Sequence, residues 1–145
     1  MTFAMSPTER ETFLAGVHVA VLSVDDPGHG PLTVPVWYAY EPGGTLDVVT
    51  GRDSHKARCL RAAGRFSLCA QNETRPYGYV SVEGRIAAIL DPVPPGVRQA
   101  MAYRYLGQEF GDLYLAATEE REAEQAMFRL APERWRSTDY AKQYG

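Results

Sequence analysis

The sequence has few cysteines and lacks a long hydrophobic run. Its 145 residues contain two cysteines, Cys59 and Cys69, which are too few for a disulfide framework and point to a reducing compartment. No apolar stretch approaches the roughly 20 residues that a membrane-spanning helix needs. Residues 1–6 have neither the basic start nor the apolar length of a signal peptide. We therefore expect a cytoplasmic protein without a membrane partner.

An excess of positive charge is also missing. The net charge is -3 and the isoelectric point is about 5.6, which argues against a nucleic-acid partner because domains that bind the phosphate backbone are usually basic. The sequence has no phosphate-binding Walker loop, no Gly-x-Gly-x-x-Gly and no Gly-x-Ser-x-Gly. Its three histidines, His18, His29 and His55, are scattered, with no carboxylate at metal-ligand spacing. We therefore expect no metal site.

Local signals predict several short helices. The length fits one domain over residues 1–145. Ser6, Pro7 and Glu9 form a capping pattern that predicts a helix over residues 7–15. A second helix is predicted up to residue 63, capped by Ser54 and closed by Gly64. Helical spacing predicts a third helix over 96–106 and further helical turns over 110–117 and 119–125. A polar tail occupies 139–145.

The other apolar segments predict strands. Residues 17–24, 31–40 and 46–50 are joined by short turns and predict an antiparallel meander. Further strands are predicted over 65–71, 77–90, 126–130 and 134–138. Gly84 predicts a bulge or bend in the longest strand, and Pro35 predicts an edge, bulge or ligand-facing position. The simplest arrangement is a mainly-β fold, a closed or nearly closed antiparallel barrel with three or four short helices outside, and an open sheet is the alternative.

The segment from Thr50 to Arg58 is the most informative. It runs from a strand end through a Gly turn into a helix start, where free N–H groups and the helix dipole disfavour cations. Four basic residues nevertheless gather there, including one of the two lysines of the chain: Arg52, His55, Lys56 and Arg58. A bound anion, most simply a phosphate group, would relieve this conflict. The alternative is a solvated basic face with Asp53 as the cap partner.

Two aromatic segments and one carboxylate admit two interpretations each. Residues 34–40 could offer backbone groups to a flat heterocycle, but ordinary barrel core is the simpler interpretation. Residues 133–142 could seal a subunit interface or a ligand pocket, or could form a sheet-edge strand with solvated charges. Glu83 could act as a general acid or base, although a partner role for a neighbouring arginine is favoured.

Taken in order, these segments resemble the pyridoxamine 5'-phosphate oxidase-like superfamily of flavin-binding split β-barrels. The resemblance covers residues 8–140. The combination of Thr50, Ser-x-Lys-Ala and a later Val-x-Val-Glu-Gly is more specific than any piece alone. The matching segments are Val19–Leu22, Val34–Ala39, Thr50–Ala57, Arg65–Leu68 and Val80–Gly84.

The resemblance implies a split barrel of six or seven strands and a homodimer with two cofactor sites at its interface. Lys56 falls where the family places a phosphate-binding lysine, and His55 falls where it often has an arginine. The other residues implied to line the phosphate pocket are Thr50, Gly51, Arg52 and Ser54. The backbone of Val34, Pro35, Val36 and Trp37 would follow the isoalloxazine edge. Tyr79 would stand where true oxidases place a flavin-contacting glutamine, and Trp135, with Tyr140 or Lys142, would reach in from the partner subunit.

The chain departs from the true oxidases at two places. Thr33-Val34 stands where they carry a phosphate-binding arginine, and the substrate-gripping signature that follows their C-terminal tryptophan is missing after Trp135. The chain is more similar to the flavin- or deazaflavin-dependent oxidoreductases, some of which use coenzyme F-420. The resemblance therefore implies hydride transfer between F-420 or FMN and a small organic substrate, with a slight preference for F-420. The alternative is a non-catalytic carrier or sensor of flavin, haem or a tetrapyrrole.

Overall fold

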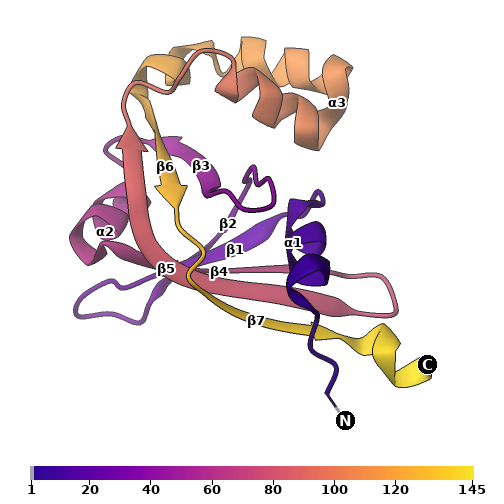
Figure 1. The fold of residues 1–145 in the computed structure, drawn as a ribbon. Coiled ribbons are helices and arrows are strands. Elements are labelled where there is room, and N and C mark those ends of the chain that lie inside the picture. The colour runs from indigo at the N-terminus through magenta and orange to yellow at the C-terminus, as the bar shows by residue number, and fades with distance from the viewer. Residues whose placement is uncertain (1) are drawn as a thin grey trace.

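A computed structural model describes residues 2–145 as a curled antiparallel sheet with helices around it (Figure 1). The strands are β1 (Ala20–Val24), β2 (Leu32–Val36), β3 (Leu46–Gly51), β4 (Arg65–Asn72), β5 (Gly78–Leu90), β6 (Gln125–Leu130) and β7 (Arg134–Asp139). The helices are α1 (Pro7–Ala15), α2 (His55–Ala63) and α3 (Val97–Ala117), with the 3-10 helices η1 (Glu119–Glu124) and η2 (Tyr140–Tyr144). Over residues 2–145, none of these helices combines the length and apolar character that crossing a bilayer requires.

The predicted helix caps are confirmed. Ser6 and Glu9 form a reciprocal capping box at the start of α1. At α2, the hydroxyl of Ser54 accepts a hydrogen bond of 3.1 Å from the N–H of Ala57. Gly64 ends α2 in the left-handed conformation with φ of 67°, which a side chain would disfavour. These boundaries were predictable because capping uses residues only three or four positions apart.

The sheet is a split barrel whose longest strand belongs to both halves. Hydrogen-bonded neighbours follow the order β2-β1-β4-β5-β6-β3, and β7 pairs with β5 outside this path. All the pairs are antiparallel. The first half of β5 lies between β4 and β7, and its second half pairs with β6. Figure 1 shows β5 bending from one half of the barrel to the other. The predicted mainly-β split barrel is therefore confirmed.

The predicted meander of the first three strands is wrong. β2 pairs with β1, but β3 pairs along its whole length with β6, and a single bridge between Ala39 and Asp47 links it to the segment after β2. Tyr38, which follows β2, forms its hydrogen bonds outside the first three strands. Its N–H donates to the hydroxyl of Tyr105 in α3, and its own buried hydroxyl donates to the carbonyl of Leu14 at 2.6 Å. These partners are far away in the sequence, so the local pattern could not reveal them.

The bulge in β5 lies beyond Gly84. The register shifts between Ile86 and Ala88, whereas Gly84 itself pairs regularly with Phe66. Gly84 instead permits a close approach, since a Cβ atom there would lie 1.9 Å from the carbonyl oxygen of Ala131. The close packing of the β6–β7 connection on β5 therefore depends on a residue without a side chain.

The core fills the inside of the curled sheet, under α1 and α2. Alternate residues of each strand face it, which gives β3 and the first half of β5 regular buried and half-buried alternation. Its largest fully buried side chains include Tyr38, Phe128, Leu14, Leu22, Leu46, Leu60 and Leu68. α3 is broken at Gly107, where φ is 77°, and its two parts lie side by side at the top of Figure 1. The two helical parts predicted there are thus confirmed.

Candidate functional site

The turn from β3 into α2 holds the predicted phosphate-binding residues. Thr50 is buried, and its hydroxyl lies 3.4 Å from the hydroxyl of Ser54. The Ser54 hydroxyl donates to the carbonyl of Gly51 at 2.8 Å while it caps α2. No hydrogen bond among residues 2–145 uses the amide N–H of His55 or Lys56. Two free donors therefore stand at the positive end of the helix dipole.

Three of the four basic residues already have acceptors within the chain. Arg52 forms a two-fold ion pair with Asp91, at 2.5 and 2.6 Å, and also donates to the carbonyl of Ala123. Arg58 donates to the carbonyl of Asp53 at 2.7 Å. The conflict between cations and the helix dipole is thus partly relieved by acceptors of the protein itself. Asp91 lies 39 residues away from Arg52, so no local pattern in the sequence predicts this pair.

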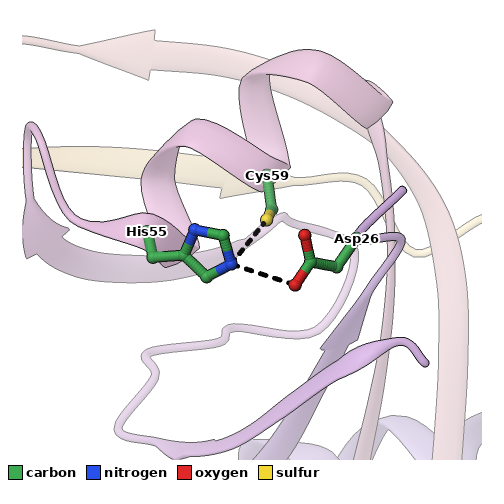
Figure 2. Close-up of side chains that lie close together, drawn as sticks. All are labelled: Asp26, His55 and Cys59. Atoms are coloured by element: carbon green, nitrogen blue, oxygen red, sulfur yellow. Dashed lines mark hydrogen bonds and ion pairs between the residues drawn. The ribbon is translucent and has the colours of Figure 1, made fainter. Parts of the chain in front are cut away.

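His55 has an acceptor as well. Its Nε2 atom lies 3.0 Å from a carboxylate oxygen of Asp26, which comes from the connection between β1 and β2 (Figure 2). The hydrogen bond from His55 lowers the pKa of the Asp26 carboxyl. Asp26 was not among the predicted site residues, because 29 residues separate it from His55.

Lys56 differs from the other three. Over the described residues 2–145 its ammonium group has no ion-pair partner and no hydrogen-bond acceptor. The side chain is half-buried, and this burial lowers its pKa because a charge is disfavoured away from water. A bound anion would stabilise the charged form. The conflict that predicts an anion at this helix end is thus unrelieved for Lys56 within residues 2–145, and its role as a phosphate ligand stays a prediction.

Two segments are predicted to contact the cofactor: β2 and the turn after β3. The barrel is split between β2 and β3, which do not form a ladder with each other. If the bridge between Ala39 and Asp47 continued in register, Val36 would pair with Thr50 and Pro35 with Gly51. No such ladder forms, and β2 has a strand on only one side among residues 2–145. The main chain of β2 therefore offers an unpaired edge next to the end of β3, as Pro35 suggested.

The side chains of this segment mostly serve the core. Val36 is buried, and Val34 packs against the core. Trp37 stacks on Tyr105 with ring centroids 5.0 Å apart and planes tilted by 6°, and it also contacts Tyr114. Only Pro35 of these four residues is exposed. The interpretation of this segment as barrel core thus holds for its side chains. The predicted contacts with a cofactor ring involve its backbone, at the unpaired edge of β2.

The outer face of the β2, β1 and β4 strands is apolar at one end, around Val21, and polar beyond it, where Ser23 pairs with Thr33 and Ser67. Val17, Val19 and Val21 are 57%, 55% and 41% exposed, which is unusual for valine. Val21 pairs with Pro35 on one side and with Cys69 on the other, and this row borders a shallow groove of about 710 Å³. Contiguous apolar surface of this kind marks an interaction face. Tyr79 lies on the same sheet, opposite Gln71 of the groove.

Comparison with known proteins identifies the family of the chain. The sequence pattern described as pyridoxamine 5'-phosphate oxidase matches residues 6–139. The chain belongs to this family. No curated protein matches the chain.

Solved structures of the same fold are similar over most of the chain. A conserved hypothetical protein from Mycobacterium tuberculosis, Rv2991, is 24% identical, with a TM-score of 0.75, 97% of this chain covered and 89% of that one. A structure described as an F420 reductase is 17% identical (TM-score 0.63, 86% and 94% covered). The FAD and heme binding protein from Mycobacterium smegmatis is 18% identical (TM-score 0.69, 92% and 71% covered). At these identities the likeness establishes the fold.

In this member of the pyridoxamine 5'-phosphate oxidase family, Trp135 packs within its own chain. The guanidinium of Arg10 lies 4.7 Å above its ring, and Tyr40 meets it edge-on with centroids 6.3 Å apart. Trp135 is the second residue of β7 (Arg134–Asp139), so the strand predicted over 134–138 is confirmed. Glu83 lies 3.5 Å from Arg134, which fits its expected role as an arginine partner. Whether Trp135 also serves a partner subunit stays a prediction.

The C-terminal tail is folded against α1. The ammonium of Lys142 donates to Glu9 at 2.8 Å, and this bond, together with those from Ser6, lowers the pKa of Glu9 to about 2. We expect Lys142→Met to raise the pKa of Glu9 toward its ordinary value of 4.5 without reaching it, because the bonds from Ser6 persist. In the wild type, the contact stabilises the protein above pH 4.5 and is lost as the pH falls toward 2.

An NMR titration of the Glu9 carboxyl group measures this shift. Gln143→Met changes the neighbouring exposed residue and should leave the pKa of Glu9 low. An equally low pKa in Lys142→Met would mean that the tail is not held by this contact.

Proposed function

We propose that this family member is an oxidoreductase that binds F-420 or FMN and transfers a hydride to or from a small organic substrate. The half-buried ammonium of Lys56, which has no partner within residues 2–145, carries the proposal. It stands on the first turn of α2, where two amide N–H groups are also free, and α2 follows directly from the end of β3. Partial burial disfavours a cation that has no counter-ion, so an unpartnered lysine at this position favours a bound anion.

The phosphate group of the cofactor would take the place of that counter-ion. The N–H groups of His55 and Lys56 would donate to its oxygens, and the Lys56 ammonium would neutralise its charge. Ser54 caps the helix and holds these N–H groups in place. Thr50 supports Ser54 from the end of β3. Both F-420 and FMN present a phosphate and a tricyclic ring, so this pocket does not separate them.

The ring of the cofactor would lie along the unpaired edge of β2. Its main chain from Val34 to Trp37 is held rigidly, because the side chains of Val34 and Val36 pack inward and Trp37 is stacked under α3. The bound flavin or deazaflavin would supply the hydride chemistry. The protein would bind and orient the ring and restrict the access of water.

A second copy of the chain would complete the site. The exposed valines of β1 and its lead-in, with Pro35 and Cys69, form an apolar face beside the edge of β2. Burial of this face in a homodimer would remove it from water and would close the ring site from the other side. Tyr79 lies on the same sheet and is the candidate ring contact there.

The first test is an absorption spectrum of the purified protein, followed by fluorescence titrations with FMN and with F-420. Preferential F-420 binding, and its oxidation or reduction with small organic substrates, would support the deazaflavin activity, and the same results with FMN would support the flavin activity. Tight binding without turnover would favour a carrier or sensor. Binding of neither cofactor would overturn the proposal. Sedimentation equilibrium measures the dimer separately.

A further inference from the structure

Three side chains with metal-binding groups converge at the side of α2. His55 and Cys59 lie one helical turn apart on α2, and Asp26 reaches them from the connection between β1 and β2 (Figure 2). Their donor atoms lie within 4.8 Å of one another. Cys59 is buried, Asp26 half-buried and His55 exposed, so the cluster is open to solvent on one side. The three residues are separated in the sequence by up to 33 positions, and only the packing of the β1–β2 connection on α2 unites them.

The arrangement does not fit a proton relay. In a Cys-His-Asp relay the imidazole uses one ring nitrogen for each partner. Here the Nε2 atom of His55 faces both of them, at 3.0 Å from the Asp26 oxygen and 3.7 Å from the sulfur of Cys59. A single proton on Nε2 cannot serve the two contacts well. A metal ion, in contrast, binds several donor atoms that lie around one position, as these three do.

The two distances to the Nε2 atom of His55 are close to those of a tetrahedral centre. With Zn–S near 2.3 Å and Zn–N near 2.0–2.1 Å, tetrahedral geometry separates sulfur and nitrogen by about 3.6 Å, and the nitrogen and a carboxylate oxygen by about 3.4 Å. The observed separations of 3.7 and 3.0 Å need shifts of only a few tenths of an ångström. Small side-chain rotations would therefore suffice to admit the ion.

We propose that Asp26, His55 and Cys59 form a zinc-class metal site, with His29 as the fourth ligand. His29 follows Asp26 by three residues in the same connection, and its Nδ1 atom lies 4.0 Å from the other carboxylate oxygen of Asp26. Its side chain is largely exposed and would turn toward the cluster to bind the ion. A thiolate and two imidazoles select a soft or borderline ion such as Zn²⁺ over Mg²⁺ or Ca²⁺.

Binding of Zn²⁺ would release one proton, which comes from the Cys59 thiol. Burial and the nearby Asp26 carboxylate raise the pKa of the Cys59 thiol, so without metal the cysteine is protonated at neutral pH. Zn²⁺ would form a bond to the sulfur and displace that proton to solvent. The ion would tie the β1–β2 connection to the first turn of α2. Of the four ligands only His55 is also a candidate cofactor residue, and it would use its backbone N–H for the phosphate but its Nε2 atom for the metal, so the two sites use different groups.

The test uses the tag-free full chain, freed of metal by a chelator, and titrates it with Co²⁺ and then Zn²⁺. We expect one equivalent of Co²⁺ to give the intense visible bands of a tetrahedral site and a thiolate-to-cobalt charge-transfer band, and Zn²⁺ to displace it. Zn²⁺ should also raise the melting temperature in proportion to the logarithm of its free concentration. Weak bands of octahedral type, or no saturable binding, would overturn the proposal.

Two matched cysteine variants make the assignment specific. Cys59→Ala should abolish the charge-transfer band and weaken Zn²⁺ binding on the order of 100-fold or more, because a thiolate ligand is lost. Cys69→Ala removes the other cysteine, on β4, and should bind as the wild type does. An unchanged cobalt spectrum in Cys59→Ala would refute the site. If Cys59→Ala does not fold, Asp26→Asn, which preserves side-chain volume, should weaken binding in the same assay, and wild-type affinity would count against the proposal.

Discussion

Replacement of Gly84 by alanine should cost about 3–5 kcal/mol of folding free energy, which is a large share of the roughly 5–15 kcal/mol that stabilises a domain. The added Cβ atom would lie 1.9 Å from the carbonyl oxygen of Ala131, far inside van der Waals contact. Since that oxygen belongs to the backbone, no side-chain rotation relieves the clash. The turn before β7 must move, and the hydrogen bonds from Ala131 to Arg85 and from Glu133 to Glu83 would lengthen or break.

Urea denaturation monitored by circular dichroism measures this effect. Gly30→Ala is the matched control, because Gly30 lies in the β1–β2 connection with open space around its Cβ position, and we expect a change within about 0.5 kcal/mol. A Gly84→Ala protein with the midpoint of the wild type would show that the turn at Ala131 does not press against β5.

Lys56→Met should separate cofactor binding from stability. Loss of a charge-assisted contact to phosphate costs about 1.5–3 kcal/mol, or roughly a 10- to 150-fold rise in the Kd of F-420 or FMN. The cofactor-free variant should be at least as stable as the wild type, because burial disfavours the lysine charge. Its pH dependence should differ as well. At pH values between the lowered pKa of Lys56 in the folded protein and its ordinary value of 10.5, the unfolded state binds more protons than the folded state. The stability of the wild type relative to Lys56→Met should therefore rise as the pH increases through this range.

Fluorescence titration and thermal denaturation of the same samples test both parts. Arg65→Met removes one exposed positive charge at the start of β4 and controls for a general loss of attraction to anions. We expect its Kd to stay near that of the wild type at moderate salt. The phosphate assignment is falsified if Lys56→Met binds both cofactors with unchanged affinity.

The α2 region shows how far local sequence reasoning reached into the site. The cap at Ser54, the end at Gly64 and the position of Lys56 on the first turn all follow from residues within one helical turn of each other. Which of the basic residues have carboxylate partners could not be predicted in this way. Arg52 and His55 look equivalent to Lys56 in the sequence, yet each has a carboxylate partner from a distant loop. Only folding distinguishes the unpartnered lysine from its paired neighbours.

The sequence by itself determined the elements and the family of this protein, because capping, alternation and turn signals act over a few residues. It determined the edge position of Pro35 for the same reason, since a residue without an N–H group excludes a strand on that side. The tertiary structure decided how the strands pair. β3 pairs with β6 rather than with β2, and Tyr38 after β2 forms its hydrogen bonds with Tyr105 and Leu14. The meeting of Asp26 with His55 and Cys59 was decided in the same way. Contacts between residues far apart in the chain depend on how whole elements pack, and no local pattern records that.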